Sequence, residues 1–378
     1  MISGAFLVSI AGQSRPRARD MGIAPGIYEP GPLNAITDVE EVRVGHTTLV
    51  EGDAVRTGVT AVLPHGGNLF QDKVAGGVFV GNAFGKLAGS TQVHELGTIE
   101  TPIVLTNTLS VGIAMDAVVR YTLAEPGNEQ VRSVNALVGE TNDGGLNDIR
   151  GLHVTREHVL QAIRTASDGL VPEGSVGAGT GTICYGWKGG IGTSSRKLPA
   201  TGSGQGGYTV GVLAQTNFGG NLTIAGVPLF RMLQPPARRG AREVRAKRRP
   251  ETTGSSSNGS CMIVVATDAP LDARDLERLA ARAVFGLGRT GSAYSNGSGD
   301  FAVAFSTSTE MRSRFNDAAP RARRVLPPDA ASPLFEAALE ATEEAVYNSL
   351  FRATSVTSRF GTAEAIPIER VKELLKRE

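Results

Sequence analysis

The chain of 378 residues has little cysteine, few aromatic side chains and almost no net charge. Its two cysteines, Cys184 and Cys261, lie far apart in the sequence and lack metal-site spacing, which argues against a disulfide framework and favours a reducing, cytoplasmic compartment. Aromatic residues make up 5% of the chain while 48 residues are glycine, so we expect many turns and close backbone approaches rather than stacked rings.

The chain also lacks a long apolar run and a large excess of positive or negative charge. No run approaches the roughly 20 apolar residues that a membrane-spanning helix needs, and the short apolar stretch 5–10 has no basic residue before it, unlike a secretory signal. With a net charge of +1, the chain as a whole has no electrostatic attraction for nucleic acid or an anionic membrane. The basic run 238–249 has no interleaved aromatic residues. We therefore predict neither a nucleic-acid partner nor a membrane partner.

What is present is the alternation of strand and helix patterns. Residues 1–33 indicate an irregular lead-in, after which short β-branched runs bounded by glycine or asparagine alternate with stretches of helical spacing. We expect strands at 36–47, 58–64, 75–85, 102–109, 208–214, 261–266 and 301–305, and helices at 111–123, 268–286 and 332–350. The last helix has Ser332 as its expected cap and Pro333 in its first turn. The pattern predicts a mixed α/β protein with layered sheets, although length alone leaves one or two domains open.

A loop of small and basic residues, 234–258, runs directly into the apolar strand 261–266 through Asn258-Gly259-Ser260. If the peptide bond between Gly259 and Ser260 is cut, Ser260 gains an α-amino group whose ordinary pKa of about 7.7 to 8.0 suits it to accept a proton from the neighbouring hydroxyl. Gly259 permits strained backbone angles and close approach to its carbonyl. The junction suggests a self-cleaving N-terminal nucleophile, but an ordinary loop serine at a strand start has the same pattern.

Motifs along nearly the whole chain decide between these alternatives. The chain resembles the family of L-aminopeptidase/D-esterase-amidases and β-peptidyl aminopeptidases, which are self-processing serine hydrolases. The matching blocks are ITDVEEVRVGHT at 36–47, ETNDGGLNDIRG at 140–151, VGAGTG with WKGGIGTSSR at 176–196, QTNFG at 215–219, NGSCMIVVATDAPL at 258–271 and NGSGD at 296–300.

The resemblance implies catalytic roles for four residues. Ser260 would be the nucleophile, and Asn217 in QTNFG would donate a hydrogen bond to the developing oxyanion. Ser298 and Asp300 in NGSGD would lie beside the nucleophile and take part in the proton path; their spacing of two puts them on one face of an extended segment. Some relatives have glutamate at position 300, and aspartate is one methylene shorter. Without the resemblance, Asn217 would be taken as a strand-ending residue and NGSGD as a turn.

Two further residues are implied to contact substrate. Glu140 aligns with the carboxylate that holds the free amino group of the substrate, which would explain removal of N-terminal residues. At Gly145, many relatives carry an aromatic residue, so we expect a wider or differently shaped pocket here. The preference of relatives for L-, D- or β-residues is therefore not transferable.

The resemblance also implies a four-layer α/β/β/α sandwich of the N-terminal-nucleophile hydrolase type. Residues 1–259 and 260–378 would be two chains of one folded unit that assembles as a homo-oligomer, by resemblance a tetramer. The reaction would be acyl transfer to water, with no metal or organic cofactor. A related acyltransferase and a catalytically silent binding protein remain alternatives at this point.

Rival sites have weak support. The sequence has no GxSxG motif, and the glycine-rich stretch 174–192 lacks the order of a phosphate-binding loop. We expect Cys261 to point away from the site into the core, Trp187 to pack, and the histidines to be structural, since they form no metal-binding motif. The histidines are His46, His65, His94, His153 and His158.

Overall fold

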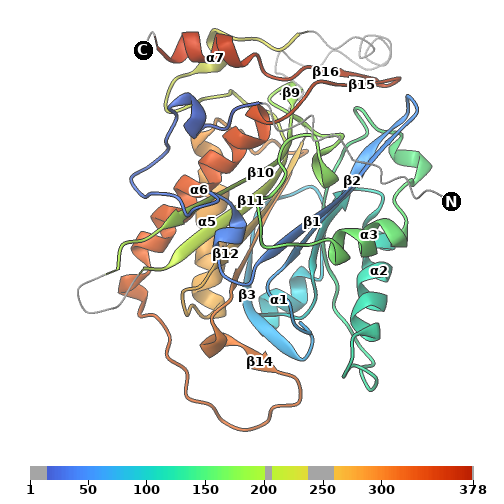
Figure 1. The fold of residues 1–378 in the computed structure, drawn as a ribbon, viewed down its shortest axis with the longest axis vertical. Helices are drawn as coiled ribbons and strands as arrows, with labels where there is room; N and C mark the ends of the chain where they lie inside the picture. Colours follow the sequence, from blue (N-terminus) through green and yellow to red (C-terminus); the bar gives the residue numbers. More distant parts are fainter. Residues whose placement is uncertain (1–14, 201–206, 237–258, 377–378) are drawn as a thin grey trace, which may run out of the picture.

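A computed structural model describes residues 15–200, 207–236 and 259–376. Two β-sheets lie face to face, with α2 (Val111–Ala124) and α3 (Arg156–Arg164) on one side and α5 (Ala273–Arg289) and α6 (Ser332–Phe351) on the other (Figure 1). This arrangement is the α/β/β/α sandwich, so the fold class predicted from the sequence is confirmed. The basic run 238–249 and Asn258 lie outside the described residues.

The first sheet has five strands, and its outer face packs on α2 and α3 through an apolar cluster that includes Val59, Val104, Val118 and Val159. In spatial order its strands are β1 (Arg43–Glu51), β2 (Val55–Leu63), β6 (Ile103–Asn107), β7 (Leu137–Thr141) and β4 (Leu87–Ala88). The β6 and β7 pair is parallel, so their carboxyl ends meet at one edge.

The second sheet has seven strands, and α5 and α6 cover its outer face. In order its strands are β10 (Gly190–Lys197), β11 (Thr209–Asn217), β12 (Ser260–Thr267), β13 (Gly299–Ser306), β3 (Asp72–Ala83) and β14 (Ser313–Arg314), with β5 (Thr98–Ile99) beside β3. The smaller elements are α1 (Ser90–Leu96), β8 (Ile183–Cys184), β9 (Trp187–Lys188), β15 (Val356–Ser358), β16 (Gly361–Ala363) and α7 (Ile368–Leu375).

Strand β12 separates two cores because its side chains alternate between the faces of the sheet. Met262 and Val264 belong to the core between the two sheets, whereas Cys261 and Val265 belong to the core beneath α5 and α6. The burial of Cys261 agrees with its expected place in the core. Ser260 shares the face of Met262, which directs it to the space between the sheets.

Several expected boundaries are wrong. The expected strand 36–47 begins at Arg43, because Ile36–Asp38 forms a 3-10 turn and Glu41 adopts a left-handed φ of 72° that interrupts extension. The expected helix 268–286 begins at Ala273, since the side chain of Asp272 caps it. Ser332 is the first residue of α6 rather than its cap.

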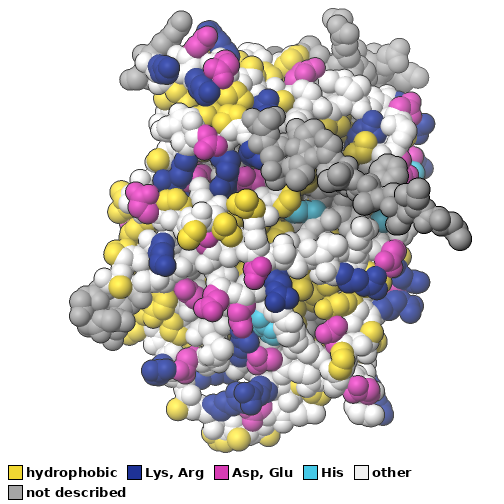
Figure 2. Space-filling view, viewed as in Figure 1, with side chains coloured by type: hydrophobic (Ala, Val, Ile, Leu, Met, Phe, Trp, Pro, Cys, Tyr) yellow, Lys and Arg dark blue, Asp and Glu magenta, His cyan; other side chains and the backbone are white. Residues whose placement is uncertain are grey.

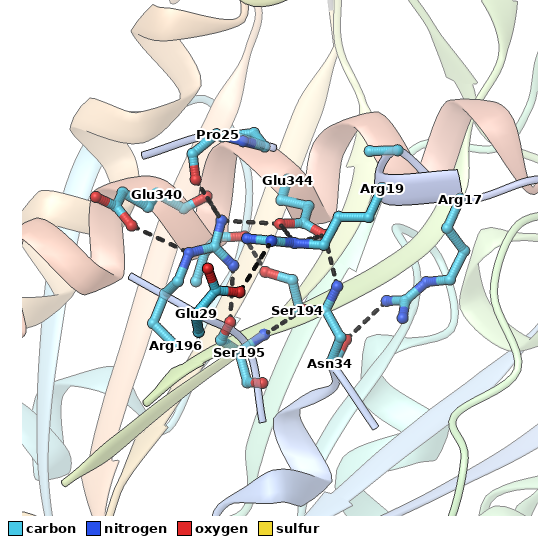
Figure 3. Close-up of polar contacts among 12 residues, drawn as sticks. Arg17, Arg19, Pro25, Glu29, Asn34, Ser194, Ser195, Arg196, Glu340 and Glu344 are labelled. Atoms are coloured by element: carbon cyan, nitrogen blue, oxygen red, sulfur yellow. Dashed lines mark hydrogen bonds and ion pairs between the residues drawn. The ribbon is translucent and has the colours of Figure 1, made fainter. Parts of the chain in front are cut away.

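The segment that precedes β1 is irregular, as expected, but a buried charge cluster ties it to α6 (Figure 3). Arg196 of β10 lies between Glu340 and Glu344 of α6, with Nε 3.1 Å from one carboxylate and Nη2 2.8 Å from the other. Arg19 adds a second cation 3.0 Å from Glu344. The guanidinium of Arg196 also donates to the carbonyl of Pro25 at 2.9 Å. The cluster therefore holds residues 17–34 against the second sheet.

Basic and acidic side chains are interleaved on the face drawn in Figure 2. Within the described ranges, none of the helices combines the length and apolarity that a bilayer crossing requires.

Candidate active site

Three neighbouring strand ends bring the central residues together. β11 ends at Asn217, β12 begins at Ser260, and β13 begins at Gly299. The register pairs Asn217 with Ser260 and Ser260 with Gly299. Adjacent strands lie about 4.8 Å apart, so the candidate nucleophile and the candidate oxyanion donor are direct neighbours.

The hydroxyl of Ser260 shares a hydrogen-bond donor with the preceding peptide. The backbone N–H of Gly299 lies 3.2 Å from Ser260 Oγ and 3.2 Å from the carbonyl oxygen of Gly259. Ser260 is 6% exposed. A polar N–H therefore points at the bond between Gly259 and Ser260 from the neighbouring strand.

Glycine is required at position 259 because neighbouring backbone leaves no room for a Cβ atom. A Cβ at this position would lie 2.2 Å from the carbonyl oxygen of Asn217 and 2.5 Å from the Cα of Phe218, both of them backbone atoms that cannot move aside cheaply. Close approach to neighbouring backbone is therefore a property of glycine that this position uses.

The carboxamide of Asn217 is fixed in one orientation by two backbone groups. Its Oδ1 accepts from the N–H of Ile183 at 2.9 Å, and its Nδ2 donates to the carbonyl of Asn142 at 3.0 Å. An amide nitrogen carries two hydrogens, and the hydrogen bonds among the described residues use one of them, so the other could donate to an oxygen formed beside Ser260.

Ser298 and Asp300 form a buried pair, as their spacing suggests. Ser298 Oγ donates to Asp300 Oδ1 at 2.9 Å, and Oδ2 of the same carboxylate has no hydrogen-bond partner among the described residues. Burial raises the pKa of Asp300 to about 6, although the hydrogen bond from Ser298 opposes the shift. Within the described ranges no side-chain hydrogen bond joins the pair to Ser260; the connection is Gly299, between them.

Glu140 lies at the carboxyl end of β7, buried and with partners that the sequence did not reveal. Its Oε1 accepts from the backbone N–H of Lys86 at 3.0 Å and lies 3.1 Å from the Lys86 ammonium, while the hydroxyl of Thr108 donates to Oε2. A Cβ at Gly85 would touch both Glu140 Oε1 and the Cα of Gly299, at 3.4 Å each. A single methyl group could therefore touch both the Glu140 carboxylate and Gly299, the first residue of β13, which pairs with Ser260.

Lys86, which is half exposed, could have been suggested by one signal alone: a buried carboxylate such as Glu140 needs partners. No motif marks it. Gly145 lies half-buried in the loop that follows β7, the same loop that provides the Asn142 carbonyl to Asn217. Position 145, which has no aromatic ring, is therefore three residues from Asn142, whose carbonyl contacts the candidate oxyanion donor Asn217.

Other features of the described residues do not compete with this constellation. Surface cavities of about 500 and 630 Å³ lie beside α2, and neither is lined by the residues above. No group of three or more metal-ligating side chains is placed to hold an ion in the parts of the chain that are described. The half-buried His46 lies 2.9 Å from the hydroxyl of Thr60, and desolvation of its ring lowers its pKa to about 4.

Comparison with known proteins agrees with the geometry. The profile of Peptidase family S58 matches residues 34–363. The chain belongs to this family. It is 42% identical to the β-peptidyl aminopeptidase BapA of Sphingosinicella microcystinivorans, over 100% of this chain and 96% of that protein.

Two solved structures of aminopeptidases resemble it closely. A β-aminopeptidase from a Burkholderia species is 39% identical with a TM-score of 0.84, covering 96% of this chain and 99% of that one. The L-aminopeptidase D-Ala-esterase/amidase of Ochrobactrum anthropi, described as a variant of the Ntn hydrolase fold, is 36% identical with a TM-score of 0.85 and the same coverage. This S58 protein is a serine aminopeptidase/amidase, which confirms the function predicted from the sequence.

Proposed function

We propose that the chain cuts itself between Gly259 and Ser260, and that the new N-terminal Ser260 then releases N-terminal residues from peptides, amides or esters. The observation that supports this best is the shared donor: one N–H of Gly299 contacts both the carbonyl oxygen of Gly259 and the hydroxyl of Ser260. Chains 1–259 and 260–378 would remain one folded unit, because β12 is central in the second sheet.

In the self-cleavage step, Ser260 Oγ attacks the carbonyl carbon of Gly259 and the negative charge develops on the oxygen that faces Gly299 N–H. The C–N bond then breaks as the nitrogen of Ser260 gains the proton that its hydroxyl has given up. The nitrogen becomes a free amine, and an ester joins the Ser260 side chain to Gly259. Water hydrolyses this ester. The products are a carboxylate at Gly259 and a free amine and hydroxyl on Ser260.

In turnover, the α-amine of Ser260 takes the proton of its own hydroxyl while Oγ attacks the substrate carbonyl. The free hydrogen on Asn217 Nδ2 donates to the oxyanion, and the pair of Ser298 and Asp300 completes the proton path. Glu140 holds the ammonium of the substrate, in place of the ammonium of Lys86. The C–N or C–O bond of the substrate then breaks, and its leaving group takes the proton held by the α-amine of Ser260 and departs. Water hydrolyses the acyl-enzyme, so no cofactor takes part.

The substrate we propose is an aminoacyl amide or short peptide with a free amine. β-Aminoacyl compounds belong in the test panel beside L- and D-residues, since one relative is named a β-peptidyl aminopeptidase. With glycine at position 145, small and bulky side chains should both be tried. We further propose a cytoplasmic homotetramer; the two buried free cysteines, Cys184 and Cys261, fit a reducing compartment.

The test compares wild type with Ser260→Ala and, as a matched control, Ser257→Ala three residues earlier. Wild type and the control should give two masses that correspond to 1–259 and 260–378 and should hydrolyse aminoacyl p-nitroanilides; Ser260→Ala should give one uncut mass and no hydrolysis. An uncut active wild type would refute the proposal. Correctly cut protein that transfers acyl groups only to an added amine would favour the acyltransferase.

A further inference from the structure

The two backbone groups that orient Asn217 each belong to a segment braced by a fully buried charge. We propose that Lys188 and Asp143 are positioning residues, which hold the Asn217 carboxamide in the orientation needed to stabilise the oxyanion. This inference rests on the proposed role of Asn217. It adds two residues that touch neither the nucleophile nor the proposed substrate amine site.

Lys188 braces the segment that provides the N–H of Ile183. Its buried ammonium donates to the carbonyl of Gly179 at 2.8 Å and to that of Gly189 at 2.6 Å. The hydroxyl of Thr182 donates to the same Gly179 carbonyl at 3.0 Å. Ile183 follows directly and pairs with Lys188 in the hairpin of β8 and β9. Loss of the ammonium would leave two buried carbonyls without this donor and free the segment to shift.

Asp143 braces the other segment, which provides the carbonyl of Asn142. The buried Asp143 accepts from Asn147 Nδ2 at 3.0 Å, and its own carbonyl accepts from the N–H groups of Leu146 and Asn147 at 3.0 Å each. Asn147 Oδ1 in turn accepts from the N–H of Arg56 at the start of β2, at 3.0 Å. The loop and its Asn142 carbonyl are thereby tied to the first sheet.

The two braced segments meet at Gly181. A Cβ there would lie 2.9 Å from the Cβ of Asp143 and 2.1 Å from the carbonyl of Arg56. The contact explains why glycine occupies this position, and it couples the segments, so a shift of one would move the other. Asn217 is thus held between two parts of the chain that support each other.

The energetics argue against simple packing as the reason for these charges. Lys188 and Asp143 attract each other but form none of the ion pairs found among the described residues. Burial dominates: it lowers the pKa of Lys188 to about 7 and raises that of Asp143 to about 6. The thiol nearest the lysine, Cys184, has its pKa raised to about 12 by burial. Burying two charges without direct pairing is costly, and apolar residues of similar volume would avoid that cost.

The test is a double-mutant cycle on processed protein. The variants are Lys188→Met, Asp143→Asn and Asn217→Ala, alone and in pairs with Asn217→Ala; Lys197→Met, an exposed lysine on β10, is the matched control. kcat and KM are measured with an aminoacyl p-nitroanilide per molecule of cut enzyme. Circular dichroism checks the fold.

We expect Lys188→Met and Asp143→Asn each to lower kcat at least tenfold with KM within about twofold, because an oxyanion donor acts in the transition state and its complete removal typically costs about 10² to 10³. Neither should slow Asn217→Ala further. The Lys197→Met control should match wild type.

Additive losses in the cycle, or an unchanged kcat in both single variants, would overturn the inference. If either Lys188→Met or Asp143→Asn does not self-cleave, the double-mutant cycle is measured with the other variant. If neither self-cleaves while Asn217→Ala still does, Lys188 and Asp143 act on the scissile bond and the inference is wrong. An unaffected kcat in Asn217→Ala would instead refute the proposed function, which separates the two failures.

Discussion

Arg196→Met tests the buried charge cluster that joins β10 to α6. The methionine fits the apolar stem but removes the cation between Glu340 and Glu344, all three of which are buried. Glu344 retains Arg19, whereas Glu340 retains no charged partner among the described residues, only the N–H groups of residues 27 and 28. The change therefore leaves an uncompensated negative charge inside the protein.

The expected loss follows from this geometry. Breaking a buried ion pair by removing one partner costs about 3–5 kcal/mol. The entropy of unfolding is about 2.1 cal/mol/K per residue, which for 378 residues gives roughly 0.8 kcal/mol per degree. Arg196→Met should thus lower the melting temperature by about 4–6 °C, measured by differential scanning calorimetry on samples in the same processing state.

Two further variants make the measurement decisive. Arg370→Met removes an exposed cation 2.8 Å from Glu373 on α7, so it should change the melting temperature by less than about 1 °C. The double variant Arg196→Met/Glu340→Gln restores neutrality and should recover part of the loss. A melting temperature for Arg196→Met equal to that of Arg370→Met, or a double variant less stable than Arg196→Met, would refute the electrostatic reasoning.

Three other predictions concern the site. Gly259→Ala places a methyl group against neighbouring backbone atoms and should slow self-cleavage about a hundredfold or more. Intact-mass measurements over time would follow the cleavage, and cleavage at the normal rate would contradict this prediction. Asp300→Asn should abolish most activity yet stabilise the fold by up to about 3 kcal/mol above pH 6, because the raised pKa of this carboxyl makes its ionised form unfavourable in the folded state; the gain in urea denaturation should vanish below about pH 4. Glu140→Gln should raise KM for free-amine substrates about tenfold or more while Lys86→Met lowers it, and equal effects of the two variants would refute competition for the carboxylate.

The layered sheets and helices were predictable because they depend on local patterns. The run 261–266 is apolar at every position, which is typical of a strand buried on both faces, and β12 has that environment. Helix α2 follows its apolar spacing and ends within one residue of the expected position. At Ser260 the local pattern left an ordinary loop serine open, and only the resemblance of motifs along the chain selected it as the candidate nucleophile.

Partners that come from distant parts of the chain were not predictable from local patterns. β3 pairs with β13 although more than 200 residues separate them, and Lys86 reaches Glu140 from the segment that follows β3. Lys188 lies in a glycine-rich motif where a lysine would ordinarily be taken as solvent-exposed. Nothing in its sequence neighbours predicts that both of its close acceptors are buried carbonyls.

The unpaired oxygen of Asp300 would connect the proposed self-cleavage to the proposed catalysis. A buried acceptor without a donor costs about 1–3 kcal/mol, and Oδ2 of Asp300 has no hydrogen-bond partner among the described residues. Asp300 pairs with Cys261 in the register of β12 and β13, so it lies opposite the residue that follows Ser260. Cleavage would turn the nitrogen of Ser260 from an amide with one hydrogen into an amine with two or three. In the proposed cut enzyme, such an amine would offer the unpaired oxygen a hydrogen-bond donor from the strand that pairs with β13.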